Sequence, residues 1–127
     1  MREIKFRGKR IDNDEWVYGW FSEDYGYAEI LTEYNDCEVI LETVGQYIGL
    51  KDRDGVEVYE GDIVSFLAIQ WDGSDDDRVE YVGIVKYSDE YTAFSFEVSN
   101  DMQATTFGTD DIKVIGNIHD NFDEMLD

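Results

Sequence analysis

What this chain lacks excludes several classes of protein before any motif is considered. It has no proline, one cysteine and one histidine among 127 residues. Cys37 alone can form no intrachain disulfide, which is typical of a reducing compartment. No apolar run reaches the roughly 18 residues that a transmembrane helix needs, and residues 1–7 lack the apolar segment of a signal peptide. We therefore expect a cytoplasmic protein.

Basic residues are also scarce. The chain has 10 of them against 31 acidic residues, a net charge of −21. Their distribution is uneven, because residues 1–10 carry a net charge of +4 and the remaining 117 residues carry −25. Such an acidic surface repels nucleic-acid phosphates and anionic membranes. We therefore expect no direct nucleic-acid binding and no membrane binding.

Groups suited to catalysis are few. A Ser-His-Asp or Cys-His arrangement would have to use His119, and neither Cys37 nor any serine lies in a recognised nucleophile motif. We interpret His119 as a surface or capping residue. With 31 acidic residues, close carboxylate pairs are unavoidable and do not indicate a glycosidase. We expect a protein that is not an enzyme and predict no catalytic residue.

The acidic turns are the candidate metal sites of this sequence. Residues 52–57 begin like an EF-hand loop, but Val56 and Glu57 stand where an oxygen ligand and a glycine are required, so the match fails. The acidic residues 72–77 indicate a mobile loop between two strands, with only loose affinity for cations. No zinc spacing, dinucleotide motif or P-loop occurs. We expect no metal and no cofactor.

The dominant period of the sequence is two, which is typical of strands. In residues 3–7, Ile4 and Phe6 fall on one face. A turn at residues 12–15 leads to a second strand, in which Trp16, Tyr18 and Trp20 share a face. Two strands joined by an Asn/Asp-rich turn predict an N-terminal β-hairpin.

Further strands are expected along most of the chain. The run 63–69 is apolar on both faces, which predicts a strand inside a sheet. Asp54-Gly55 suits a tight hairpin turn. The other expected strands lie near residues 28–32, 38–41, 44–50, 56–58, 79–87, 92–98 and 112–116. A series of short strands along most of the chain favours a closed or nearly closed small barrel.

The period changes at the C-terminal end. Ile118, Phe122, Met125 and Leu126 have the spacing of one helix face, and residues 121–124 resemble a capping box. This predicts a short amphipathic helix over roughly residues 118–126. No proline, linker or repeat marks a boundary, so we expect residues 1–127 to form a single domain.

A candidate interaction surface lies on the N-terminal hairpin. Aromatic residues and arginine often anchor protein interfaces. The aromatic side chains could instead be core or a contact between copies, and the basic ones could lie over acidic neighbours of their own fold or meet an acidic patch on a second copy. Base stacking is disfavoured because no basic groove accompanies the aromatics. The candidate residues are Lys5, Arg7, Lys9, Trp16, Tyr18 and Trp20.

Three segments, in this order, resemble one known family. They are EIKFRGK with WVYG, then GQYIGLKD running through to YEGDIV, and finally VIGNI. Together they resemble the YopX-like proteins of phages and prophages over nearly the whole chain. The resemblance implies an SH3-like barrel core with additions, and it assigns no activity and no catalytic residue. Phe122 departs from the family, whose C-terminal helix tends to start with a proline at that position.

The middle segment also has a plain structural interpretation. Gly55 and Gly61 allow unusual backbone angles, and Asp62 can accept hydrogen bonds from backbone amides where a strand begins. These residues therefore need no catalytic or binding role.

Three functions remain open. The first is a non-enzymatic protein-interaction module of phage or prophage type, with an unknown protein partner that could come from the host, and with self-association through the N-terminal hairpin. The alternative is an acidic DNA mimic that inhibits a host DNA-binding enzyme, although excess charge can also serve solubility alone. The second alternative is an undetected enzyme, since folds do not dictate functions.

Overall fold

The computed structural model describes residues 4–24, 26–69, 78–89, 92–99, 102–105 and 109–120. Contacts divide the chain into a first unit, residues 1–49, and a second unit, residues 50–127. Each unit is described by itself below. That residues 1–127 form one domain stays a prediction.

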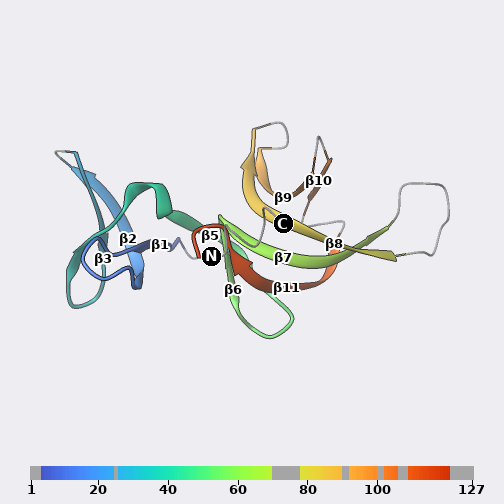
Figure 1. The fold of residues 1–127 in the computed structure, drawn as a ribbon, viewed down its shortest axis with the longest axis horizontal. Coiled ribbons are helices and arrows are strands. Elements are labelled where there is room, and N and C mark those ends of the chain that lie inside the picture. The colour runs from blue at the N-terminus through green and yellow to red at the C-terminus, as the bar shows by residue number, and fades with distance from the viewer. Residues whose placement is uncertain are drawn as a thin grey trace. The chain divides into compact units, whose positions relative to one another are not determined.

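The fold is mainly β, as expected (Figure 1). The described residues contain one short 3-10 helix, η1 (Leu41–Thr43), and no α-helix. None of their helices could span a membrane. The strands are β1 (Phe6–Lys9), β2 (Trp16–Asp24), β3 (Tyr27–Leu31), β4 (Asp36–Glu38), β5 (Gly45–Lys51), β6 (Glu57–Tyr59), β7 (Asp62–Ile69), β8 (Arg78–Ser88), β9 (Ala93–Ser99), β10 (Met102–Thr105) and β11 (Thr109–Asn117).

In the first unit the strands follow the order β4-β3-β2-β1-β5. The predicted N-terminal hairpin is confirmed, since β1 and β2 pair antiparallel from Lys9 opposite Trp16 to Phe6 opposite Gly19. Beyond that point β2 pairs with β3 instead, beginning at Trp20 opposite Leu31. The two halves of β2 therefore have different neighbours.

The core of the first unit lies against one face of β2. Successive strand residues point to opposite faces, and Val17 and Phe21 are the β2 residues that reach this core. Its buried centre is Ala28, Ile30 and Val39, with Phe6, Val17, Phe21 and Val44 packed around it. Trp16, Tyr18 and Trp20, at the alternate positions, are left to the other face.

Gly19 lies where β2 passes from β1 to β3. A Cβ atom at this position would stand 2.3 Å from the backbone oxygen of Leu31. Real Cβ atoms do not approach an oxygen so closely, so the two backbones can pack here only because Gly19 has no side chain.

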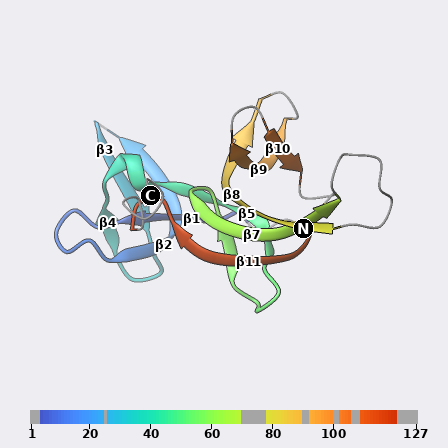
Figure 2. The same ribbon diagram turned by 45° about the vertical axis from the view of Figure 1, so that its right-hand side comes forward.

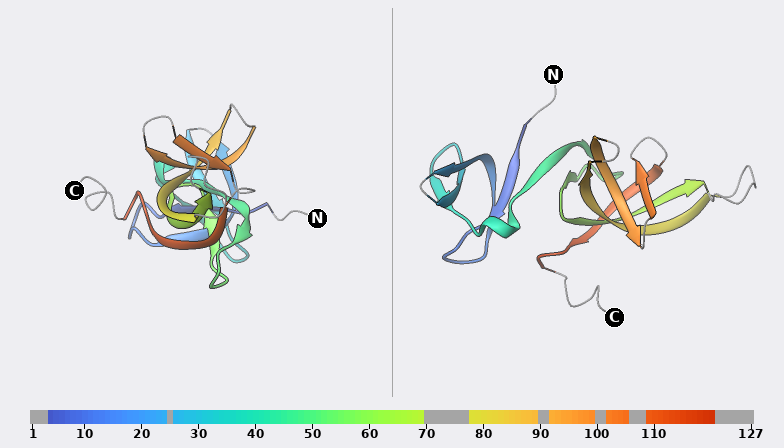
Figure 3. Two further views of the ribbon diagram at one scale, coloured as in Figure 1. Left: turned by 90° about the vertical axis from the view of Figure 1, so that its right-hand side faces the viewer. Right: turned by 90° about the horizontal axis from the view of Figure 1, so that it is seen from above.

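The second unit contains a curved antiparallel sheet with the order β10-β9-β8-β7-β11 (Figure 2). The same curvature is visible from the end and from above (Figure 3). β7 lies between β8 and β11, as its two-sided apolar pattern predicts. In the core, the Phe66 ring lies 5.0 Å from the Phe96 ring and 5.9 Å from the Tyr81 ring, centroid to centroid.

The glycines of the middle motif occupy left-handed backbone conformations. Gly55 has φ +84° and Gly61 has φ +89°. Asp62 is 1% exposed, and its Oδ2 accepts a hydrogen bond of 2.8 Å from the Tyr59 amide. The structural interpretation of Gly55, Gly61 and Asp62 is confirmed.

Asp52 has a similar role in the turn before β6. Its Oδ1 accepts hydrogen bonds from the amides of Asp54 and Val56, and its Oδ2 accepts one from the amide of Val114, each at 2.9 Å. Burial raises the pKa of Asp52, but these three hydrogen bonds outweigh it, and the pKa lies below the ordinary 3.8. The carboxylate that begins the EF-hand-like segment is thus occupied by backbone amides.

The expectation of a closed barrel is wrong for the strands that the structure describes, because both sheets are open. The edge strand β11 shows why the sheet of the second unit stays open. The Arg53 amide donates to the Ile112 carbonyl oxygen, and the Asp52 carboxylate accepts from the Val114 amide. A turn and a side chain therefore satisfy backbone groups that a further strand would pair in a barrel.

Several other predicted elements either lie outside the described residues or differ in their bounds. Residues 118–120 form a turn, and the rest of the expected helix 118–126, including Leu126, lies outside the described residues, as does the acidic segment 72–77. The first strand is Phe6–Lys9 rather than residues 3–7, and β4 is Asp36–Glu38 rather than residues 38–41, because Leu41 begins η1. The sequence did not predict β10, because in MQAT only Thr105 belongs to the residue types enriched in strands.

Replacing Gly19 by alanine tests the close packing of β2 and β3. We expect Gly19→Ala to lower the free energy of unfolding by at least about 3 kcal/mol, because backbone atoms must shift to admit the Cβ. The matched control is Gly26→Ala, which has φ +83° and open space around it. It should lose only about 1–2 kcal/mol. Urea unfolding gives both values, and equal losses would contradict the proposed contact.

The lowered pKa of Asp52 makes its contribution to stability depend on pH. A carboxylate with a depressed folded-state pKa stabilises the fold above its unfolded pKa and loses that effect as pH falls through the folded value. We expect Asp52→Asn to cost about 1–3 kcal/mol at neutral pH, and the cost to shrink below about pH 4. Urea unfolding across pH measures it, with the exposed neighbour Asp54→Asn as control. A cost that does not vary with pH would contradict this account.

Candidate functional site

Four of the candidates, Arg7, Lys9, Trp16 and Tyr18, share one face of the β1–β2 hairpin. Directly opposed residues of an antiparallel pair point to the same face. Arg7 lies opposite Tyr18, and Lys9 lies opposite Trp16. We call Trp16, Tyr18 and Trp20 the aromatic stripe, and Lys5, Arg7 and Lys9 the basic row.

Two members of the basic row lie over the same aromatic ring. The Arg7 guanidinium carbon is 4.5 Å from the centroid of the Trp16 ring, and the Lys9 Nζ is 5.5 Å from it. Arg7 is only 6% exposed. Each cation–π contact contributes about 0.5–2 kcal/mol, more where the cation is desolvated, so Trp16 helps to hold the buried charge of Arg7.

The third member of the basic row lies near Tyr47 on β5. The Tyr47 amide donates to the Lys5 carbonyl oxygen at 2.8 Å, and the Lys5 Nζ is 5.8 Å from the centroid of the Tyr47 ring. All three basic side chains therefore lie over aromatic rings of their own unit. The sequence did not reveal Tyr47 as part of this surface, because its pairing with Lys5 depends on the placement of β5.

The aromatic stripe is not core. Tyr18 is 48% exposed and Trp20 is 54% exposed, while Trp16 is half-buried. Trp20 lies one residue beyond the last β1–β2 pair, and its ring meets the ring of Phe6 edge to face, with centroids 6.4 Å apart. The interpretation of the stripe as core is therefore wrong for Tyr18 and Trp20. A contact with a partner stays a prediction.

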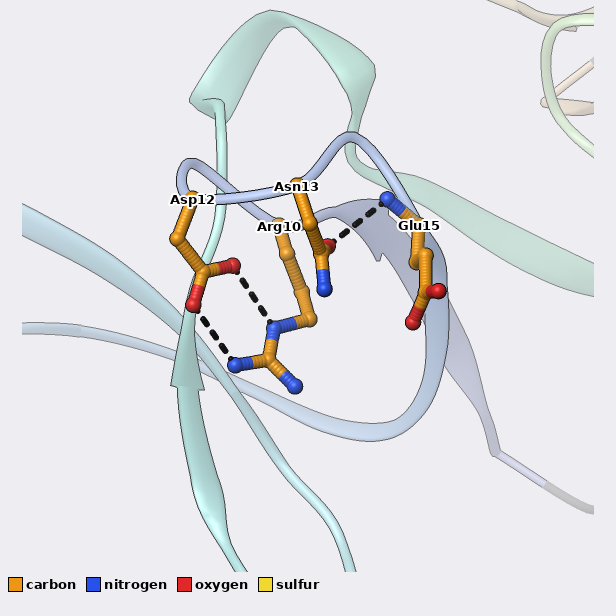
Figure 4. Close-up of polar contacts among 4 residues, drawn as sticks. All are labelled: Arg10, Asp12, Asn13 and Glu15. Atoms are coloured by element: carbon orange, nitrogen blue, oxygen red, sulfur yellow. Dashed lines mark hydrogen bonds and ion pairs between the residues drawn. The ribbon is translucent and has the colours of Figure 1, made fainter.

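Arg10 stands apart from the basic row (Figure 4). Its Nε donates to Asp12 Oδ1 at 2.9 Å and its Nη2 donates to Asp12 Oδ2 at 2.8 Å. This hydrogen-bonded pair raises the pKa of Arg10 and lowers the pKa of Asp12. In the same turn, the Glu15 amide donates to the side-chain oxygen of Asn13 at 3.0 Å. The turn thus pairs Arg10 with a carboxylate of its own.

Carboxylates lie at the other end of β2. Ser22 is opposite Glu29, and Asp24 is opposite Tyr27. By alternation, Asp24 and Glu29 share the face of Trp20. Along this face, from the N-terminal to the C-terminal end of β2, the side chains are therefore first cationic, then aromatic and exposed, and then carboxylate. Sequence alternation alone could have indicated Asp24, but placing Glu29 requires the β2–β3 register.

One depression in the part of the chain that the structure describes is too small for an ordinary ligand site. A depression of about 90 Å³ in the second unit is lined by Arg53, Glu80 and Asp111 among others, whereas ligand pockets hold roughly 300–1,000 Å³. Arg53 Nη1 donates to Asp111 Oδ2 at 2.9 Å inside it. The described residues contain no group of three potential metal ligands. The absence of metal, cofactor and catalytic residues stays a prediction.

Trp16 can be tested as the support of the buried Arg7. We expect Trp16→Leu to lower the free energy of unfolding by about 2 kcal/mol or more, because Arg7 and Lys9 lose the ring that they contact. The matched control, Trp20→Leu, removes a half-exposed ring and should cost about 1 kcal/mol or less. Chemical denaturation measures both. Equal losses would mean that the cation–π contacts contribute nothing specific.

Comparisons with known proteins bear on the fold and on the family of this chain. A crystal structure of protein EF1440 from Enterococcus faecalis is similar to this chain, with a TM-score of 0.56 and 22% sequence identity over 100% of both chains. At that identity the likeness bears on the fold alone. No curated protein matches the sequence. The sequence profile described as YopX protein matches residues 5–126. Nearly the whole chain is thus covered by one profile, and the chain belongs to the YopX protein family.

Proposed function

We propose that this protein is a non-enzymatic protein-interaction module that binds its partner through the aromatic stripe. The observation that carries this proposal is the exposure of Tyr18 and Trp20, at 48% and 54%, on a strand whose other face already packs the core. Large aromatics exposed side by side on a folded surface favour an interface.

The stripe is also held in place, which lowers the entropic cost of binding. Trp16 contacts Arg7 and Lys9, and Trp20 rests against Phe6. A partner would therefore meet rings that are already ordered. Tyrosine, tryptophan and arginine are the residue types most enriched among interface anchors.

Family membership supports two finer parts of this proposal. As a member of the YopX family, the protein is proposed to be of phage or prophage type, acting in the cytoplasm on a protein that could come from the host. The curved five-stranded sheet of the second unit is proposed to be related to the SH3-like barrels. Neither part is needed for the stripe to bind.

A DNA mimic is the second candidate, and it would use a different surface. The net charge of −21 supports it, since an acidic protein can occupy the basic cleft of a DNA-binding enzyme. Such binding would weaken steeply with added salt and would compete with DNA. Binding through Tyr18 and Trp20 would depend chiefly on apolar burial and would respond far less to salt.

A pull-down with matched variants tests the proposal. We expect wild-type protein to recover a stoichiometric protein from a host lysate, and Tyr18→Ser/Trp20→Ser to lose it. Tyr34→Ser is the control, because Tyr34 is 84% exposed and lies outside the stripe. Retention by the stripe variant would contradict the proposed surface. A nuclease recovered only at low salt and displaced by DNA would instead support the mimic.

A further inference from the structure

The outer face of β2 carries opposite charges at its two ends. At the N-terminal end, Lys9 lies opposite Trp16 and supplies the partly exposed cation, while Arg7, opposite Tyr18, is buried. Asp24 and Glu29 lie on the same face at the C-terminal end, beyond Trp20. Tyr18 and Trp20, both about half exposed, lie between the two charged ends.

This order is self-complementary under a two-fold axis. A strand rises about 3.3 Å per residue, so Trp16 and Ser22 are separated by roughly 20 Å along β2. If two copies met face to face with their β2 strands antiparallel, the axis would pass near residues 18–20. The cationic end of each copy would then lie over the carboxylate end of the other, and Tyr18 of one copy would pack near Trp20 of the second.

We propose that the partner of the aromatic stripe is a second copy of this chain, in a symmetric dimer that pairs the outer faces of the two β2 strands. This inference rests on the proposed function, since it names the partner of the same surface. A single chain supplies both complementary ends, as a contact between identical surfaces requires. An unrelated partner would need this charge order by coincidence.

The charge of the whole chain decides how the dimer responds to salt. Two molecules of net charge −21 repel each other at long range, and exposed charge pairs at the contact contribute only about 0–1 kcal/mol each. Burial of Tyr18 and Trp20 must therefore supply most of the affinity. Added salt screens the net repulsion, so self-association strengthens with salt, which is the opposite of binding to a basic partner.

Sedimentation equilibrium of the full chain tests the dimer. We expect wild type to dimerise at about 100 μM or below, more tightly at about 150 mM salt than at about 10 mM. Tyr18→Ser/Trp20→Ser should raise the dissociation constant at least about tenfold. Tyr34→Ser should leave it unchanged. Urea unfolding of each variant checks that the fold is intact.

Charge reversal tests the antiparallel arrangement. Lys9→Glu and Asp24→Lys should each weaken the dimer, and the double variant Lys9→Glu/Asp24→Lys should restore the wild-type constant to within about threefold. A role of Lys9 in its own unit alone would give no such rescue. Failure of rescue, or a dimer that survives Tyr18→Ser/Trp20→Ser, would overturn the arrangement.

A monomeric wild type at about 100 μM would overturn the inference outright. If that monomer still captured another protein through the stripe, the proposed function would stand with a different partner. If neither self-association nor capture depended on Tyr18 and Trp20, both proposals would fail together.

Discussion

The alternation of side chains along β2 governs what the first unit can do. Val17 and Phe21 pack on Ala28, Ile30 and Val39, so the intervening aromatics must face outward. The N-terminal half of β2 pairs with β1 and its C-terminal half pairs with β3. This change of neighbour is possible only because the backbone at Gly19 can approach Leu31 closely. One strand thereby completes the core and at the same time presents a surface.

The structure shows where the basic side chains of the N-terminal segment lie on that surface. Three of the five basic residues in the first ten positions lie on aromatic rings, Arg7 and Lys9 on Trp16 and Lys5 on Tyr47. A buried guanidinium is costly unless its charge is compensated, and the face of an indole ring offers part of that compensation. The aromatic stripe and the basic row therefore stabilise each other.

The family motif in the middle of the chain stabilises turns rather than performing chemistry. Asp52 and Asp62 direct carboxylate oxygens at backbone amides, and Gly55 and Gly61 supply the left-handed angles that these turns require. Through Val114, Asp52 also connects its turn to the edge strand β11. Acidic residues that could be mistaken for ligands or catalytic groups are thus occupied by the backbone.

The sequence alone determined the local features: nine of the eleven described strands, the turn at residues 12–15, and the shared face of Trp16 and Tyr18. Alternation and turn chemistry are encoded in neighbouring residues, which is why they could be read directly. The exposure of Trp20, the proximity of Tyr47 to Lys5, the placement of Glu29 and the open edge of β11 could not. Each depends on which strands pair and in what register, and such contacts between distant residues are fixed by burial and hydrogen bonding of the whole sheet.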